Sequence, residues 1–281
     1  PLKKAVIEVC GACNYKCQMC PHSLDGGRER SFRQMMNYQM YLGILDQLID
    51  SKVEEIYLEG SGEPSMNKKL PAFVEAGTER GFKMCFITNG SLMKGQFMKD
   101  VVDAGLHFAR VSVTGYNREK YIEWMSEDNF DLILENCHAM MDYIGSSGSD
   151  ATIGSYSLII DNDNQDYEIE QYRKNFISKV PGIKSSIWRM HNWSGVYDEV
   201  TWRKKKSTRR SCGRPFSPDL IVRAGGNDGK KGAVVPCCMV LGQDSKAVLG
   251  HLSENTIEEI YYGEAYENLR KLHREHRFDE I

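Results

Sequence analysis

Long apolar runs and a strong excess of either charge are both missing from this sequence of 281 residues. No apolar run approaches the roughly 20 residues that a membrane-spanning helix needs, so we expect no membrane partner. The formal net charge is −3 and the pI is about 6.2. Because nucleic-acid-binding domains normally carry a basic face, we expect no nucleic-acid partner, and we interpret the basic run at 203–210 as a solvated loop.

The nine cysteines follow no even set of regular spacings, and no secretory leader precedes them. This pattern argues against a secreted disulfide framework and favours a reducing compartment, so we expect a cytoplasmic protein. The chain begins with Pro1 rather than Met, and we expect residues to be missing from its front. Hydrophobic residues make up 41% of the chain, which is enough for an ordinary core.

Apolar, β-rich runs alternate with amphipathic stretches about 25 residues apart, a pattern that predicts parallel strands joined by helices. The expected strands are 5–9, 55–58, 82–87, 107–113, 152–160 and 185–190. The expected helices are 37–49, 69–80, 95–104, 128–143 and 166–178. The predicted fold class is therefore α/β, a partial (β/α)6 barrel over residues 1–193 that is open on one side. Because parallel barrels carry their chemistry at the C-terminal strand ends, we looked for the site there.

Three cysteines stand at CxxxCxxC spacing after the first expected strand, namely Cys13, Cys17 and Cys20. Three thiolates on so short a loop can hold three corners of one [4Fe-4S] cluster and leave the fourth iron free for an outside ligand. The alternative is a Cys3His zinc site that includes His22. The step from Cys20 to His22 is too tight to wrap comfortably around one ion, so the spacing favours the cluster.

This motif resembles the signature of the radical S-adenosylmethionine (SAM) enzymes. In that family the free iron chelates the amino and carboxylate groups of SAM. One electron from the cluster cleaves SAM to methionine and a 5′-deoxyadenosyl radical, which takes a hydrogen atom from the substrate. The resemblance therefore implies a [4Fe-4S] cluster, SAM as cofactor, and a flavodoxin- or ferredoxin-type electron donor.

Two segments at strand ends resemble parts of the family's cofactor site. Gly62 and Glu63 match the second and third positions of the family's Gly-Gly-Glu segment, which binds the SAM amino group, whereas Ser61 departs from the first position. Thr88 and Asn89 belong to a Thr-Asn-Gly segment similar to the one that lines the family's cofactor pocket. By the residues alone, both segments could be simple turns.

Further residues on or near the strands are candidates for contacts with SAM. Ser112 matches a polar strand residue that the family directs toward the ribose, and strand alternation places it on one face with Thr114. Met19 occupies the family's adenine-contacting position, although it could equally fill the core. The strand at 152–160 offers only Ile159 and Ile160 as loose counterparts of the family's adenine-binding residues.

The last expected strand of the barrel carries an arginine. Arg189 shares a face with Ile187 and His191 by strand alternation. A buried arginine facing the barrel interior must be paired, so Arg189 is a candidate for holding a carboxylate of SAM or of the substrate. An ordinary surface or salt-bridge residue is the alternative. We expect the remaining barrel cysteines to be core residues, and these are Cys10, Cys85 and Cys137.

Residues 194–211 are polar and irregular and read as a linker. Cys212 follows, then two short apolar runs at 219–223 and 232–235, then Cys237 and Cys238, and a helical pattern at 256–273. This order resembles the opening of the SPASM extension, or the shorter Twitch extension, of radical SAM enzymes. The resemblance implies a small α+β unit over 212–281, a β-hairpin plus a helix, in which Cys212 and Cys237 ligate an auxiliary [4Fe-4S] cluster.

No cysteine follows Cys238, although the family completes the auxiliary site with later cysteines. Residues beyond Ile281 could supply the ligands, Cys238 and a non-cysteine group could complete a partial site, or no auxiliary cluster is held. We favour a truncated extension. Cys238 is also a candidate hydrogen donor to a substrate radical, as an epimerase needs, with a purely structural cysteine as the alternative.

The resemblance does not assign the substrate. Peptide-modifying members often carry an added N-terminal peptide-binding domain, and none is visible ahead of the first strand. We therefore expect a small polar substrate, a sugar or an aminocyclitol, that is oxidised or epimerised. The alternatives are a peptide maturase and a non-enzymatic zinc-binding protein.

Overall fold

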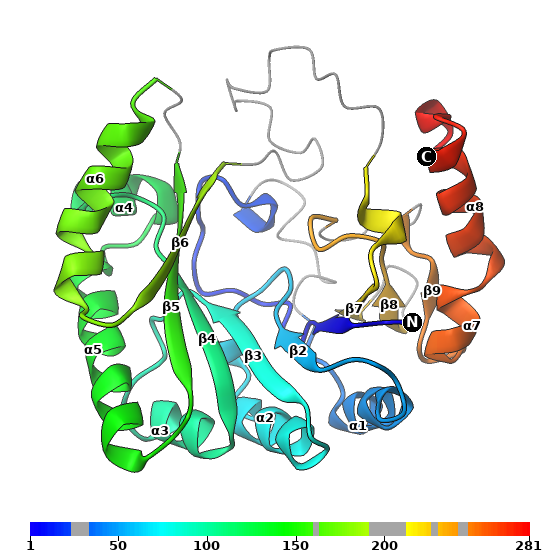
Figure 1. The fold of residues 1–281 in the computed structure, drawn as a ribbon, viewed down its shortest axis with the longest axis horizontal. Coiled ribbons are helices and arrows are strands. Elements are labelled where there is room, and N and C mark those ends of the chain that lie inside the picture. Colours follow the sequence, from blue (N-terminus) through cyan, green and yellow to red (C-terminus); the bar gives the residue numbers. More distant parts are fainter. Residues whose placement is uncertain (24–33, 160–162, 191–211, 226–229, 241–246) are drawn as a thin grey trace.

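The computed structural model describes residues 1–23, 34–159, 163–190, 212–225, 230–240 and 247–281. Nine strands form one sheet in the order β6-β5-β4-β3-β2-β1-β7-β8-β9 (Figure 1). The barrel strands are β1 (Lys4–Ile7), β2 (Glu55–Leu58), β3 (Lys83–Thr88), β4 (Leu106–Ser112), β5 (Thr152–Ile159) and β6 (Lys184–Arg189). Each pairs in parallel with its neighbour, so the expected α/β fold with a partial barrel is confirmed.

The barrel helices cover the outer face of this sheet (Figure 1). They are α1 (Tyr38–Leu48), α2 (Leu70–Glu79), α3 (Gly95–Asp103), α4 (Arg118–Met125), α5 (Phe130–Ser147) and α6 (Gln165–Asn175). Strand residues that face them, such as Ile7, Ile56 and Phe86, are fully buried in the main core. Short 3-10 helices are also present at Pro21–Ser23, Pro64–Met66, Ile177–Lys179, Arg214–Phe216 and Phe278–Glu280.

The opposite, inner face of the sheet carries a second apolar cluster. It comprises Val6, Tyr57, Cys85, Ile221 and Val235, and we call it the inner cluster. Because side chains alternate along a strand, β1, β2 and β3 contribute residues to both faces, and Ile221 of β7 and Val235 after β8 complete the inner cluster. The three cysteines predicted to be core residues, Cys10, Cys85 and Cys137, are all buried.

Helix α4 is not among the elements expected from the sequence. The side chain of Asn117 caps its first turn by accepting a hydrogen bond from the backbone N–H of Lys120 at 2.9 Å. Ser126 ends the helix in the left-handed conformation, with φ of 58°. The helix expected at 128–143 corresponds to α5, which continues to Ser147.

The C-terminal segment extends the barrel sheet. Strand β7 (Asp219–Gly225) pairs in parallel with β1, and β8 (Lys231–Val234) and β9 (Gly250–His251) then pair antiparallel. The first strand of the expected hairpin is thus also a strand of the barrel sheet, on the open side of β1.

The single helix expected at 256–273 is two helices, α7 (Ile257–Tyr261) and α8 (Glu264–Arg274). Gly263 separates them, and a Cβ atom at this position would lie 2.3 Å from the backbone oxygen of Glu259. The backbone therefore approaches too closely here for a larger residue, so glycine is required at the break.

Some expectations concern residues outside the described ranges. They are the linker at 194–211, the inward placement of His191, and a cofactor contact by Ile160. In the described part of the chain, no helix combines the length and the apolar character needed to cross a bilayer.

Candidate functional site

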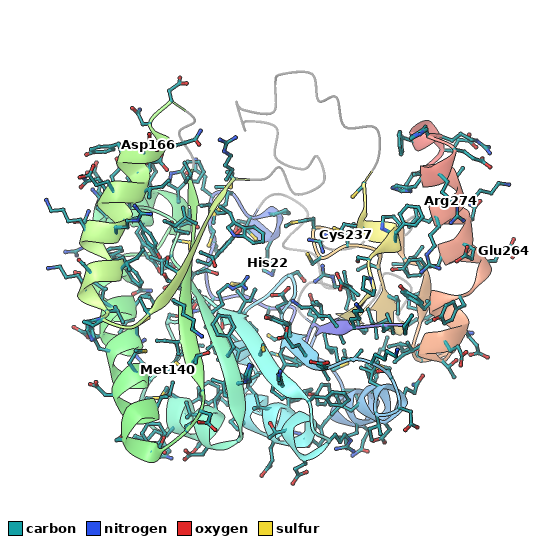
Figure 2. The ribbon with its side chains drawn as sticks, in the orientation of Figure 1. His22, Met140, Asp166, Cys237, Glu264 and Arg274 are labelled. Carbon is teal, nitrogen blue, oxygen red and sulfur yellow. The ribbon has the colours of Figure 1, made fainter. Side chains whose placement is uncertain are left out.

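The cysteine loop follows β1 and lies at the C-terminal ends of the barrel strands. The side chains of Cys13 and Cys17 are partly buried against the main core. Figure 2 shows His22, just after the loop, and Cys237, in the C-terminal segment, near the centre of the view between the barrel strands and α8. The chain therefore carries both groups of predicted cluster ligands toward the middle of the molecule.

Helix α4 supports one side of the cysteine loop. The backbone N–H of Gln18 donates to the carbonyl of Trp124 at 2.9 Å, and the sulfurs of Cys17 and Met125 lie 3.9 Å apart. The hydroxyl of Tyr15 accepts hydrogen bonds from Tyr121 and Asn129 at 3.2 and 2.8 Å. A loop anchored at its middle and at its second cysteine has little freedom to change its shape.

The Gly62–Glu63 segment lies directly against the start of the cysteine loop. The N–H of Glu63 donates to the carbonyl of Ala12 at 2.7 Å. A Cβ atom on Gly62 would lie 2.3 Å from the same oxygen, so only glycine fits there. The glycine is thus required by the approach of one loop to another, a reason that the resemblance alone did not supply.

The carboxylate of Glu63 is buried and accepts four hydrogen bonds from the protein. They come from the N–H and hydroxyl of Ser65 at 3.0 and 2.5 Å, the hydroxyl of Thr88 at 2.6 Å, and the N–H of Asn89 at 2.6 Å. Burial raises the pKa of Glu63, and these hydrogen bonds oppose the rise. The carboxylate therefore connects the ends of β2 and β3.

Asn89 continues this network into the cysteine loop. Its amide nitrogen donates to the side-chain oxygen of Asn14 at 2.9 Å, and Asn14 donates to the hydroxyl of Ser91 at 3.0 Å. Asn14 and Ser91 were not singled out from the sequence, because an asparagine between two cysteines has no distinctive spacing. In the structure they join the loop to the Thr88–Asn89 turn.

The donor set at the loop fits a cluster with one open corner. Three thiols are present. Burial raises the pKa of Cys13 to about 12 and that of Cys20 to about 11. The pKa of Cys17 is also raised, by burial and by the charges of Cys20 and Cys13. Forming thiolates in this buried loop is therefore costly. Cluster irons would offset that cost, because a thiol loses its proton when it binds a metal.

A zinc site at the loop has less support. Across the described residues, no three His, Cys, Asp or Glu side chains surround a single ion position. A ring nitrogen of His22 lies 3.0 Å from the carbonyl oxygen of Gly11 and is engaged there. Thiolates of a cluster bind different irons and so lie further apart than the ligands of one ion.

The predicted cofactor residue Ser112 and its neighbour on the same face, Thr114, are on or next to β4. Ser112 is half-buried and stands opposite Tyr156 of β5. Thr114 is fully buried, and its hydroxyl has no hydrogen-bond partner in the described part of the chain. An orphaned buried hydroxyl at a strand end fits a site for a polar cofactor.

The structure corrects the expectation for Arg189. This residue stands opposite Ile159 and is exposed, on the face away from Trp188. Trp188 faces inward and contacts Tyr156, with ring centroids 5.7 Å apart. The inward face of β6 therefore carries Trp188 rather than Arg189, so the expectation of an inward arginine is wrong. Met19 is buried in the main core, which agrees with its alternative reading as core filler.

A buried ion pair that the sequence analysis missed lies on the inner face. Arg223 of β7 approaches Glu8 at 3.3 Å, and both side chains are almost fully buried. Arg223 also donates to the carbonyls of Cys238 and Val240 at 2.9 and 2.8 Å. Glu8 in turn accepts from the N–H and hydroxyl of Ser61 at 2.6 and 2.5 Å. The pair thus connects the loop after β2 to the segment that carries Cys237 and Cys238.

The predicted auxiliary ligands lie near one another. Hydrogen bonding from Cys238 lowers the pKa of Cys237, while Cys212 is close enough for its charge to raise that pKa. The side chain of Cys238 packs against the inner cluster. In the described residues the C-terminal segment therefore offers three cysteine sulfurs, fewer than the four ligands of a fully protein-ligated cluster.

Glu59 is the second acidic residue at the end of β2. One of its carboxylate oxygens is buried and has no hydrogen-bond partner among the described residues. Burial and the neighbouring Cys238 raise the pKa of Glu59 to about 7, and this rise is opposed by Lys4, Arg110 and Arg223. A carboxyl group at a strand end whose pKa is raised to about 7 is a candidate functional group.

We predict that Arg223→Met destabilises the protein by about 3 to 5 kcal/mol, because it leaves the buried Glu8 carboxylate without its partner. Urea unfolding measures the change. Arg118→Met is the matched control, since it breaks an exposed pair with Asp128 and should shift the unfolding midpoint little. Equal small shifts in both variants would refute a structural role for the buried pair.

We predict that the stability of the wild type falls relative to Glu59→Gln as pH rises from about 4.5 to about 7. A carboxyl whose pKa is raised in the folded state stabilises the fold while protonated, and this contribution disappears above the folded pKa. Unfolding free energies at roughly pH 5 and pH 8 should show a relative loss on the order of 2 kcal/mol. Parallel pH profiles would contradict the raised pKa.

The comparison with family models matches residues 7–167 to the radical SAM superfamily and residues 229–280 to SPASM, an iron-sulfur cluster-binding domain. These families indicate a [4Fe-4S] cluster, SAM and an auxiliary iron-sulfur cluster as cofactors. Among curated proteins, the tungsten-containing aldehyde ferredoxin oxidoreductase cofactor-modifying protein of Pyrococcus furiosus is 27% identical over 305 aligned residues. That alignment covers 94% of this chain and 82% of the relative.

Two groups of solved structures share the fold. BtrN, solved with AdoMet and 2-DOIA, is 17% identical with a TM-score of 0.63 and aligns over 100% of this chain and 90% of its own. SuiB of Streptococcus suis, solved with S-adenosylmethionine, is 14% identical with a TM-score of 0.66, covering 97% of this chain and 68% of its own. Since the first family model spans more than half of the sequence, this chain belongs to the radical SAM superfamily and carries a SPASM domain.

Proposed function

We propose that this chain is a radical SAM oxidoreductase or epimerase that acts on a small polar substrate, a sugar or an aminocyclitol, at the inner face of its sheet. When bound, the cluster and SAM would supply a 5′-deoxyadenosyl radical that removes a hydrogen atom from the substrate. The observation that carries the proposal is that both groups of candidate cluster ligands lie around the inner face of the sheet. The cysteine loop lies at the strand ends, and Arg223 holds the Cys237–Cys238 segment against the same inner face.

In this proposal Cys13, Cys17 and Cys20 hold the cluster that binds SAM. Gly62 and Glu63 hold the cysteine loop in place through backbone contact and through the hydrogen bonds to Thr88 and Asn89. The rigid loop fixes where the open iron site faces. Ser112, at the end of β4, would contact the SAM ribose.

The C-terminal segment, residues 212–281, would hold the auxiliary cluster. Cys212 and Cys237 are its proposed ligands, and residues 194–211 join this segment to the barrel of residues 1–193. Cys238 packs on the inner cluster, and this position supports a role in which its thiol returns a hydrogen atom to a substrate radical in an epimerisation. A flavodoxin- or ferredoxin-type protein of the reducing cytoplasm would donate the electron.

The relatives that match over most of their length support a small substrate. The Pyrococcus furiosus relative is described as cofactor-modifying, and BtrN was solved with the ligand 2-DOIA. The second candidate function is peptide maturation, which is favoured by the likeness to SuiB, also solved with its precursor peptide SuiA. Mass spectrometry separates the two, because a maturase leaves a crosslink in a peptide and a sugar enzyme does not.

We predict that Cys17→Ala lowers dithionite-dependent cleavage of SAM to the background of protein-free controls, because one of three cluster ligands is lost. The assay measures 5′-deoxyadenosine after anaerobic reconstitution, and circular dichroism checks that the barrel remains folded. Cys137→Ala is the matched control, since this cysteine is buried in α5 and should keep SAM cleavage. Wild-type rates in Cys17→Ala would refute the assignment of the loop.

A further inference from the structure

The inner face carries a carboxylate, that of Glu59, with a buried oxygen that no described residue reaches by a hydrogen bond. Ile56 and Leu58 of β2 point to the main core, whereas Tyr57 belongs to the inner cluster, so Glu59 follows on the inward side. One of its oxygens is buried and receives no hydrogen bond from any described residue. Because an unpartnered buried carboxylate oxygen is costly, such an atom in a native site points to a ligand or ordered water.

A guanidinium group on the same face is also without a polar partner. Arg110 of β4 makes no hydrogen bond or ion pair within the described residues. It lies instead over the rings of Phe108 and Tyr156, at 5.7 and 6.0 Å from their centroids. Arg110 lowers the pKa of Glu59 through its charge, yet the two groups do not touch. A ligand between them would find one acceptor and several donors.

An aromatic pair stands beside these two charges. The ring of Trp188 meets that of Tyr156 edge to face, with an interplanar angle of 77°, and 52% of Trp188 is exposed. An exposed indole beside the half-buried side chains of Arg110 and Tyr156 offers an apolar surface for the C–H face of a saturated ring. Glu8, the other acid at the end of the neighbouring strand, is already paired with Arg223, whereas Glu59 has no ion-pair partner among the described residues.

We propose that Glu59, Arg110, Tyr156 and Trp188 form the substrate subsite, and that its ligand is an amine-bearing polyhydroxylated ring, an amino sugar or an aminocyclitol. The ammonium group donates to Glu59, ring hydroxyls accept from Arg110, and the ring rests on Trp188. This subsite rests on the proposed function and narrows its substrate class. Charge-assisted hydrogen bonds are about twice as strong as neutral ones, so the amine is the group that Glu59 selects.

The test compares three probes that share a ring and differ in charge: glucosamine, glucose and glucuronate. Binding is measured by isothermal titration calorimetry on the anaerobically reconstituted protein with SAM and without reductant. We expect glucosamine to bind about tenfold more tightly than glucose, and glucuronate to bind least. In Glu59→Gln, which keeps the shape of the side chain, glucosamine should lose its advantage over glucose. In Trp188→Ala, binding of glucosamine and glucose should weaken together.

Glu54→Gln is the matched control, because Glu54 precedes the same strand and its side chain is exposed at the surface. It should keep the preference for glucosamine. The subsite is overturned if none of the probes binds, or if Glu59→Gln retains the preference. Because binding is measured without reductant, it does not depend on SAM cleavage. Binding without SAM cleavage by the wild type would refute the proposed function alone, and cleavage without binding would refute the subsite alone.

Discussion

The buried ion pair between Glu8 and Arg223 is the constraint on which the inner face depends. Removing two charges from water is expensive, and further hydrogen bonds to both groups offset part of this cost, although the Nε of Arg223 has no partner among the described residues. Here Glu8 also accepts from the Ser61 loop, and Arg223 also holds the carbonyl of Cys238. The pair is formed between β1 and β7, so the barrel and the C-terminal segment share one sheet and one set of buried charges.

A second polar network fixes the cysteine loop from the other side. The carboxylate of Glu63 accepts four hydrogen bonds at the ends of β2 and β3, and Asn89 passes the connection to Asn14 within the loop. These networks leave Glu59 as the acid with an unused oxygen. Glu63 and Glu59 both follow β2, and they differ in the hydrogen-bond donors that reach their carboxylates. Glu63 holds the cysteine loop, and we propose that Glu59 binds a ligand.

Much of the fold and the cluster loop could be predicted from the sequence, because they depend on local patterns. The alternation of apolar runs predicted the parallel sheet, which the structure confirms, and the spacing of Cys13, Cys17 and Cys20 predicted the cluster ligands that we propose. Helix α4 was missed because it has only eight residues and a weak apolar stripe. The pair of Glu8 with Arg223 joins residues far apart in the chain, and no local pattern signals it. Arg189 was misplaced because the face of an edge strand depends on its register.

The most direct test of the central assignment is the iron content of the loop. Wild type and a variant with Cys13, Cys17 and Cys20 all replaced by alanine would be reconstituted anaerobically, and iron would be counted per chain. The account predicts that the variant binds about four irons fewer, whatever the C-terminal segment holds, since the loop ligates one [4Fe-4S] cluster. Equal iron in the two proteins would contradict it.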